Sequence, residues 1–207
     1  MVSRPPTLDC SRQKEKEKIV PRSFYENPDV VKVAKGLLGK SLFTRIEGII
    51  TGGIIIETEA YAGVNDKASH VYNNRRTKRT EVMYGPGGIA YIYFCYGMHH
   101  LINAVTNVEG IAQAVLIRAL HPTHGLKTMC ERRGKTKVDK TLTSGPGSLC
   151  KALGITMEFY GEPLDSSRLW IKDSGLVVPD GNLLTTPRIG VDYAGDDALL
   201  PYRFVIL

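Results

Sequence analysis

The residues of this chain with the clearest capacity for chemistry are two glutamates and a tyrosine that follow an apolar run. Three isoleucines at residues 54–56 precede Glu57, Glu59 and Tyr61. The β-branched run predicts a buried strand, and the two-residue period of a strand places Glu57, Glu59 and Tyr61 on one face. A buried carboxylate is costly unless it is paired or takes part in a reaction. This segment therefore indicates either a structural ion pair at a strand end or a site where a carboxylate acts.

A loop follows this strand and ends at His70. His70 together with Glu57, Glu59 or Asp66 is one conceivable set of metal ligands. No second His or Cys stands at the spacing that metal sites use. We therefore predict no metal site, and the sequence around His70 is typical of a surface or capping histidine.

The sequence also predicts a β-hairpin with large side chains at its tip. Residues 90–96 have the aromatic and β-branched composition of a strand, Gly97 permits a tight turn, and residues 101–106 form the returning strand. Tyr96 and Met98 then lie at or near the tip. Exposed aromatic and thioether groups are unfavourable for solubility, so we expect them to contact another molecule or a neighbouring loop.

Further back on the same hairpin, Tyr93 is expected to face Asn103 of the returning strand. An aromatic ring that can stack and an amide that can donate and accept hydrogen bonds suit a nucleobase pocket, and both also occur in ordinary sheets. Arg118 lies inside the next buried strand, residues 112–119. A guanidinium in that position needs a carboxylate, and Glu57 or Glu59 is the expected partner.

The elements that must position these residues alternate along the chain. Helices are predicted after Asn27, which caps Pro28 and Asp29, and at residues 125–132 and about 145–153. The remaining strands are predicted at residues 41–45, 53–61, 169–171, 188–191 and 202–206. No internal repeat or linker divides the chain, and 207 residues suit a single domain.

Charge and cysteine content narrow the class of protein. The net charge of +6 and a pI of about 9.1 favour a polyanionic partner. The four cysteines, Cys10, Cys95, Cys130 and Cys150, are scattered as in an intracellular protein with reduced thiols. No apolar run approaches the ~20 residues of a membrane span. Residues 1–20 lack a secretory signal and are expected to form a polar, loosely ordered leader.

Two basic segments stand out. Residues 73–79 contain four cations and no apolar residue, so they form either a solvated loop or a set of phosphate contacts that fix register without reading sequence. The second segment is interpreted as solvated surface and comprises Arg132, Arg133, Lys135, Lys137 and Lys140. The Gly-rich turn at residues 144–148 precedes a helix whose N-terminus could hold a phosphate, although most such turns only end a loop.

Several motifs in order along the chain carry a family resemblance. They are Glu-Thr-Glu-Ala-Tyr at residues 57–61, Ala-Ser-His at 68–70, Tyr-Ile-Tyr-Phe-Cys-Tyr-Gly-Met at 91–98 and Leu-Ile-Arg-Ala-Leu at 116–120. With these motifs the sequence resembles the alkyladenine (3-methyladenine) DNA glycosylases from about Pro21 to Leu207. Residues 144–153, 188–191 and 194–195 also fit the family, whereas the leader does not belong to it.

The resemblance implies a mixed α/β (α+β) fold over residues 21–207, a single domain with a curved, mostly antiparallel β-sheet flanked by helices. It implies a monofunctional DNA glycosylase of base excision repair. Such an enzyme flips alkylated or deaminated purines (3-methyladenine, 7-methylguanine, hypoxanthine and ethenoadenine) out of duplex DNA and hydrolyses the N-glycosidic bond. The implied partner is damaged double-stranded DNA, with no cofactor, no metal and no membrane. We expect a monomer located with the DNA, in the bacterial cytoplasm or in a eukaryotic nucleus.

The resemblance also implies a role for each matching residue. Glu59 would activate water, which Arg118 and a backbone carbonyl within residues 188–191 would help to hold. The base pocket would comprise Tyr61 and Tyr93, which sandwich the base, with His70 and Asn103. Tyr96 would wedge into the duplex beside Met98, and Arg75 and Arg79 would contact phosphates. Ser148 stands where some relatives have Lys, which puts one phosphate contact in doubt.

Three other classes share parts of the pattern. A glycoside hydrolase acting on sugars could use Glu57 and Glu59, whose Cα atoms would be about 6.5–7 Å apart, as an inverting pair. The basic composition and the single tryptophan, Trp170, argue against it. A non-catalytic nucleic-acid-binding module could stack bases on the hairpin tyrosines, but it leaves Glu59 unexplained. A metal-dependent nuclease lacks ligands. A Schiff-base mechanism lacks a lysine in the pocket strands, Lys67 being the nearest.

Overall fold

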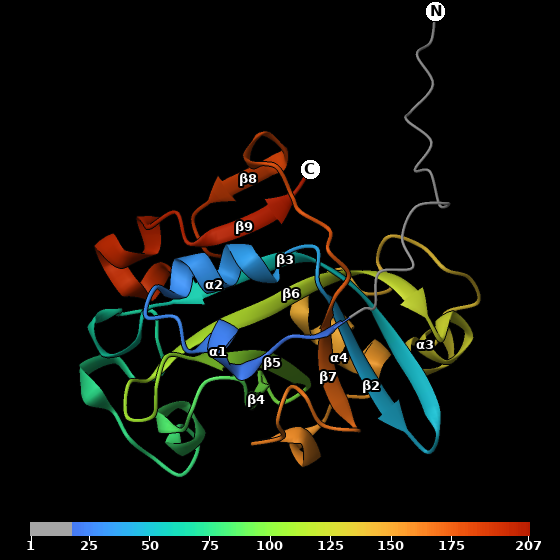
Figure 1. The fold of residues 1–207 in the computed structure, drawn as a ribbon, viewed down its shortest axis with the longest axis horizontal. Helices are drawn as coiled ribbons and strands as arrows, with labels where there is room; N and C mark the ends of the chain where they lie inside the picture. Colours follow the sequence, from blue (N-terminus) through green and yellow to red (C-terminus); the bar gives the residue numbers. More distant parts are fainter. Residues whose placement is uncertain (1–17) are drawn as a thin grey trace, which may run out of the picture.

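A nine-stranded antiparallel sheet runs through the computed structural model, which describes residues 18–207 (Figure 1). Its strands are β1 (Lys18–Ile19), β2 (Ser41–Ile46), β3 (Ile49–Tyr61), β4 (Ala90–Cys95), β5 (His99–Thr106), β6 (Gln113–His124), β7 (Leu169–Asp173), β8 (Leu183–Thr186) and β9 (Arg203–Ile206). The order is β1-β7-β2-β3-β6-β5-β4, with β9 paired to β3 and β8 to β9. The expected single-domain α+β fold with a curved antiparallel sheet is confirmed. Of the expected leader, residues 1–17 lie outside the described part of the chain.

Strand β3 is the centre of this sheet. It pairs with β6 from Gly52 to Tyr61, while its other edge is covered first by β2 and then by β9. The β3–β6 register shifts on both sides of Glu57, so Ile56 and Arg118 have no opposite residue. Such bulges interrupt strict alternation and re-aim side chains. Here the interruption lets Ile55 pack in the core while Glu57 turns toward Arg118.

The helices are α1 (Arg22–Tyr25), α2 (Val30–Leu37), α3 (Leu126–Arg133) and α4 (Pro146–Leu153). Helix α2 begins two residues later than the sequence predicted, and its cap is Asp29, not Asn27. The Asp29 carboxylate accepts hydrogen bonds from the backbone N–H groups of Val31 and Lys32, while Asn27 binds the N–H of Asp29 itself. An acidic cap both satisfies free N–H groups and complements the helix dipole, which explains the later start.

The predicted strand at residues 188–191 is wrong, because β8 ends at Thr186 and the chain is irregular from there to a 3₁₀ turn at Asp192–Leu199. Pro187 has no backbone N–H to extend the ladder with β9, and Arg188 is instead drawn into a buried ion pair. Strand β6 runs five residues past the predicted Ala119, to His124. Further 3₁₀ turns are Gly63–Asn65, Tyr72–Asn74, Glu81–Tyr84, Met157–Phe159 and Asp180–Asn182.

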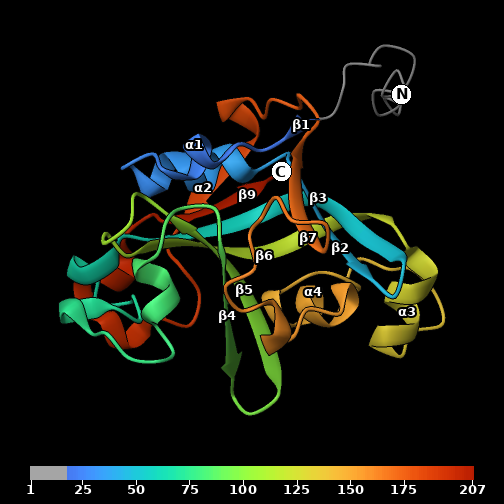
Figure 2. The same ribbon diagram turned by 60° about the horizontal axis from the view of Figure 1, so that its bottom comes forward.

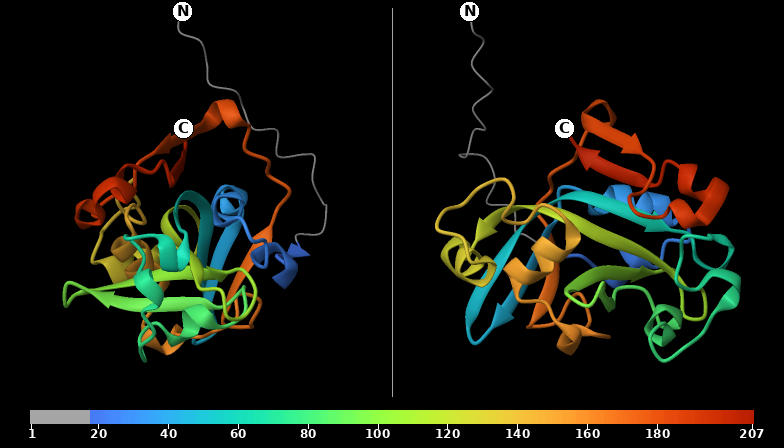
Figure 3. Two further views of the ribbon diagram at one scale, coloured as in Figure 1. Left: turned by 90° about the vertical axis from the view of Figure 1, so that its left-hand side faces the viewer. Right: turned by 180° about the vertical axis from the view of Figure 1, so that it is seen from behind.

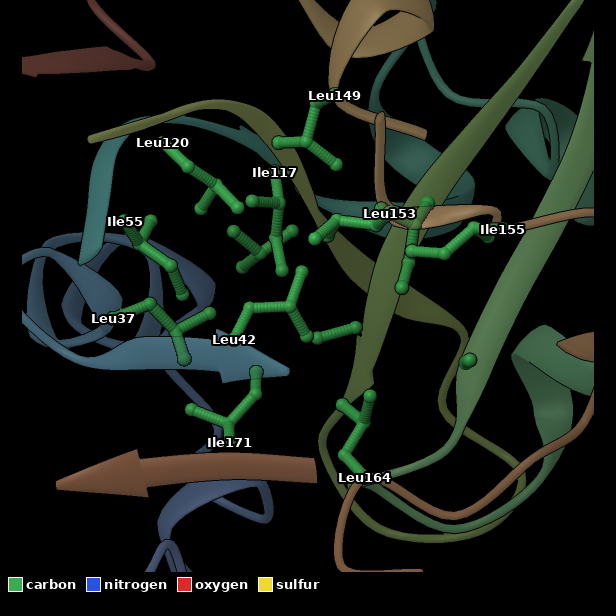
Figure 4. Close-up of a cluster of buried hydrophobic side chains, with 14 of the residues drawn as sticks. Leu37, Leu42, Ile55, Ile117, Leu120, Leu149, Leu153, Ile155, Leu164 and Ile171 are labelled. Carbon is green, nitrogen blue, oxygen red and sulfur yellow. The ribbon is translucent and has the colours of Figure 1, made fainter. Parts of the chain in front are cut away.

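One large apolar cluster joins the helices to the sheet. Figure 4 shows side chains of α2, β2, β6, α4 and β7 meeting in it, among them Leu37, Leu42, Ile117, Leu153 and Ile171. All five are fully buried, and each such side chain contributes about 1.5–3 kcal/mol relative to an exposed one. The buried face of α2, formed by Val30, Val33, Ala34 and Leu37, is part of this core. Neither α2 nor any other helix within residues 18–207 is long and apolar enough to cross a membrane.

The β4–β5 hairpin projects from the body of the protein (Figures 2 and 3). Helix α4 packs on β5, and in Figure 2 it lies on one flank of the hairpin. On the other flank lie the loops of residues 62–85, together with the 3₁₀ turn Asp192–Leu199. The free tip and its two flanks set the geometry of the functional surface.

Candidate active site

The principal pocket of about 480 Å³ is lined by the β4–β5 hairpin and by residues within 62–85. Side chains from β3, β4, β5, β6 and the chain after β8 converge on it. Seven of the ten predicted site residues line it, namely Tyr61, His70, Arg79, Tyr93, Tyr96, Asn103 and Arg118. Glu59, Arg75 and Met98 do not line it. The lining residues found in the described chain include no lysine.

Glu59 lies directly behind the wall of this pocket and is fully buried, with 0% of its surface exposed. Its Oε2 accepts a hydrogen bond from the Tyr61 hydroxyl at 2.9 Å and lies 3.1 Å from Nη1 of Arg118. Its Oε1 accepts from the backbone N–H of Ile189 at 2.8 Å. All three partners line the pocket. The carboxylate is therefore held from three directions, and Oε1 retains a lone pair that no donor within residues 18–207 uses.

Arg118 joins the two glutamates. Its Nε donates to Oε1 of Glu57 at 2.9 Å, and its Nη1 pairs with Glu59, which confirms the expected partners. Burial opposes the charge of Arg118, but Glu59 and Glu57 outweigh burial and raise its pKa. Glu57 has a second cation, because Nε of Arg203 lies 2.7 Å from the same oxygen. The two acids thus differ: Glu57 is shared by two arginines, whereas Glu59 faces the pocket wall.

Tyr61 stays a neutral phenol that donates to Glu59. Burial, and then the adjacent Glu59 carboxylate, raise the pKa of Tyr61 well above its usual value. The guanidinium of Arg188 lies over the Tyr61 ring, 4.9 Å from its centroid, and Tyr61 lines the pocket. The orientation of this pocket wall therefore depends on Arg188 as well as on Glu59.

The buried pair of Arg188 and Asp66 was missed by reasoning from the sequence. Nη1 and Nη2 of Arg188 bind the two carboxylate oxygens of Asp66, and Nη1 also donates to the carbonyl of Ala60. Asp66 further accepts from the backbone N–H groups of Ala62 and Ala68. The pair ties the loop and the C-terminal segment to β3. With both oxygens engaged in this way, Asp66 holds these segments of the fold together.

His70 is held in one tautomer. Its Nε2 lies 3.3 Å from Nη2 of Arg79, which can only donate, so Nε2 accepts and the proton resides on Nδ1. Nδ1 then donates to the Tyr91 hydroxyl at 2.8 Å. Burial, followed by the charges of Arg79 and Arg75, lowers the pKa of His70 to about 4. At neutral pH the imidazole is therefore uncharged.

The two predicted phosphate-binding arginines occupy different positions. Arg79 is exposed at the pocket wall, with its guanidinium 5.1 Å from the centroid of the Tyr93 ring. Arg75 is exposed outside the pocket. The charges of both arginines act on His70. Their contact with phosphates stays a prediction.

Asn103 faces a different residue from the one predicted. The hairpin register pairs Asn103 with Tyr91, and Tyr93 with Leu101. Nδ2 of Asn103 donates to the backbone carbonyl of Tyr91 at 3.1 Å. Its Oδ1 accepts no hydrogen bond from residues 18–207, so a polar acceptor remains available in the pocket lining.

The hairpin tip carries the two predicted exposed side chains. Tyr96 is 84% exposed and Met98 is 68% exposed. The N–H of Met98 donates to the carbonyl of Cys95 at 3.2 Å, and both central residues of this turn have positive φ, 52° at Tyr96 and 66° at Gly97. A type I′ turn of this kind favours Asn or Gly at its first central position. A tyrosine there is strained, which points to a use for its side chain.

Tyr193 is a further exposed aromatic residue at the pocket, and no pattern in the sequence predicted it. It is 71% exposed, and its hydroxyl donates to the carbonyl of Ala68 at 3.2 Å, close to His70 in the chain. The residue lies in the 3₁₀ turn Asp192–Leu199, so no period of alternating residues could have placed it in the pocket.

Comparison with known proteins agrees with this geometry. Residues 23–207 match the family described as Methylpurine-DNA glycosylase (MPG). A protein of Chlamydia felis, named "Putative 3-methyladenine DNA glycosylase", is 49% identical over 189 residues, which cover 91% of this chain and 96% of that protein. Proteins with the same name from Chlamydia pneumoniae and Bacillus cytotoxicus are 47% and 45% identical, covering 88% and 89% of this chain and 92% and 94% of theirs. From the hairpin, the pocket and these matches, we conclude that the chain belongs to the methylpurine-DNA glycosylase family of DNA-repair enzymes.

Proposed function

We propose that the protein is a monofunctional glycosylase that flips an alkylated or deaminated purine out of duplex DNA and hydrolyses its N-glycosidic bond, with Glu59 as the base that activates water. One observation carries the proposal. A fully buried glutamate is oriented by Tyr61, Arg118 and the Ile189 N–H, all of which line an aromatic pocket beside an exposed hairpin tip.

Extrusion of the base is the first step. An enzyme that acts on a base in a duplex must remove it from the stack, at a cost of a few kcal/mol. Tyr96, exposed at the tip, fills the gap and offsets part of this cost, with Met98 beside it. Poorly paired lesions cost less to extrude, so selection begins before the base reaches the pocket.

The pocket then holds the base between Tyr61 and Tyr93, with His70 and Asn103 at its edges. A ring alkylated on a nitrogen is cationic, and stacking on electron-rich tyrosines favours it. Neutral His70 presents no competing positive charge. The substrates that fit this chemistry are 3-methyladenine and 7-methylguanine, followed by the neutral hypoxanthine and ethenoadenine.

Bond cleavage places positive charge on the sugar, as in other glycoside hydrolyses. The purine leaves with the electron pair of the C1′–N bond, the water oxygen bonds to C1′, and Glu59 accepts the proton of that water. Arg118 keeps Glu59 in place and helps to hold the water. Because no lysine lies among the described lining residues, the DNA backbone is left intact at an abasic site.

The test is incubation of the protein with duplexes that carry methylated or deaminated purines, followed by chromatographic identification of what is released. We expect free base, an abasic site that breaks only on treatment with alkali, and full activity in EDTA. Binding without release would favour the non-catalytic module, and metal-dependent strand cleavage would favour a nuclease.

We further propose that the enzyme acts as a monomer, on double-stranded DNA, inside the cell.

A further inference from the structure

A second cavity lies on the opposite flank of the β4–β5 hairpin from the pocket described above. It encloses about 410 Å³ between residues 98–100, helix α4 and Arg132 of α3, and we call it the flank pocket. Tyr96 lines the principal pocket, whereas Met98 lines the flank pocket, so the hairpin tip separates the two. Figure 2 shows the corresponding arrangement of α4 and residues 62–85 on the two sides of the projecting hairpin.

Basic groups line the flank pocket. Among residues 18–207 its lining carries His99, His100, Arg132 and Lys151, and no Asp or Glu. Lys151 is exposed on α4 and makes no ion pair with any residue from 18 to 207. An exposed cation that pairs with no carboxylate of the described residues is suited to an external anion.

The floor of the flank pocket is rigid. Nη1 of Arg132 donates to Oγ1 of Thr51 and to the carbonyl of Ala152, both at 3.2 Å, which fixes the guanidinium between α3 and α4. On the other side, Gly147 allows α4 to approach the hairpin closely, since a Cβ at that position would lie 2.8 Å from Cγ of His99. The fold itself thus holds Arg132, and the helix that carries Lys151, beside the hairpin tip.

We propose that the flank pocket binds a backbone phosphate of the undamaged DNA strand. The inference rests on the proposed function, because it takes the damaged strand to follow the principal pocket, into which its base is turned. With the hairpin tip filling the gap in the duplex, the opposite strand passes over the other flank. There Lys151 neutralises a phosphate, a contact that fixes the position of the duplex without reading its sequence.

The experiment measures binding to a duplex that contains a tetrahydrofuran analogue of an abasic site. Lys151→Ala is compared with Lys32→Ala, which removes an equal charge from α2, on the part of the protein away from the hairpin tip (Figure 2). The Lys151 variant should make the dependence of log affinity on log salt about one unit less steep. The ratio of wild-type affinity to the affinity of the Lys151 variant should therefore shrink about threefold to fourfold as the salt concentration rises fourfold. Lys32→Ala should match wild type.

A second arm identifies the strand. The duplex is made with an uncharged methylphosphonate linkage at successive positions of either strand. If Lys151 contacts the undamaged strand, its replacement should have no effect on binding when one particular linkage of that strand is neutral. Loss of the effect only with a neutral linkage in the damaged strand would overturn the inference, as would unchanged affinity of Lys151→Ala. The proposed function is tested by a different assay: failure of the wild-type protein to release a base would contradict that function, whereas the binding measurements test the phosphate contact.

Discussion

Nη1 of Arg118 lies 3.1 Å from Oε2 of Glu59, at the point where β3 and β6 depart from regular pairing. Buried ion pairs of this kind add little net stability, because removing two charges from water costs about as much as their attraction returns. Stability alone therefore does not account for this pair. Its position behind the wall of an aromatic pocket indicates a role in function, since buried charges are concentrated at sites where chemistry occurs.

Replacement of Glu59 by Gln should remove catalysis and spare binding. The amide cannot accept the proton of the attacking water, so we expect the rate of base release to fall about 10²- to 10⁴-fold. Binding to a duplex with an abasic-site analogue should stay within a factor of a few. Single-turnover release of base and equilibrium binding, measured on the same preparation, check both statements.

The matched control is Glu57→Gln, which alters the other acid bound to Arg118. Because Glu57 is shared with Arg203, this change should loosen the position of Arg118 and lower stability, with a much smaller loss of base release. Equal losses in the two variants would show that Glu59 only positions Arg118, and near-normal release by Glu59→Gln would refute its role as the base.

Tyr96→Asn should separate stability from function at the hairpin tip. Asn tolerates positive φ, and Asn-Gly is the preferred pair for this turn, so relief of strain should stabilise the protein by about 1 kcal/mol. Thermal unfolding should then occur a few degrees higher, about 2–4 °C. The variant should bind damaged duplex more weakly because the side chain that fills the gap is lost. Unchanged affinity would count against the wedge.

Much of this site was visible in the sequence because its residues lie on regular elements. The alternation in residues 57–61 and the hairpin around Gly97 placed Glu59, Tyr61 and Tyr96 correctly, since local patterns determine which face or turn a residue occupies. Gly97 predicted the turn because few residue types tolerate a positive φ, and the turn places Tyr96 and Met98 at an exposed tip.

What the sequence could not supply was contact between distant irregular segments. Asp66 and Arg188 are 122 residues apart, and neither belongs to a periodic element, so no pattern links them. The hydrogen bond from the Ile189 N–H to Glu59 could not be predicted for the same reason, because it too joins segments that are far apart in the sequence. The register of Asn103 was also out of reach, because the length of the hairpin loop fixes which residues are opposite, and that loop was predicted too long.

Breaking the pair of Asp66 and Arg188 should destabilise the fold and disable the site together. Arg188→Met leaves a buried carboxylate without its partner, and we expect the free energy of unfolding to fall by about 3–5 kcal/mol. Base release should fall as well, because the Ile189 N–H and the Tyr61 ring lose their support. Urea unfolding and the release assay provide the measurements.

The control for this prediction is Arg76→Met, which breaks an exposed pair with Glu81 that has similar two-point geometry. Screening by water makes such a pair nearly neutral for stability. A comparable loss in the two variants would show that the burial of Arg188 is not what makes its pair important.

The stability of the protein should fall below neutral pH because of His70. Its pKa of about 4 in the folded state lies below the ordinary 6.5 of the unfolded chain, so between these values the unfolded state binds the proton and the folded state does not. The stability that uncharged His70 contributes to the folded state is fully present above about pH 6.5. It is lost as the pH falls toward 4, by about 3 kcal/mol in all. His70→Gln should remove this part of the pH dependence of urea unfolding, whereas His121→Gln, at an exposed position, should leave it. Retention of the full slope by the His70 variant, or titration of His70 near pH 6.5 by NMR, would contradict the buried neutral tautomer that joins Arg79 to Tyr91.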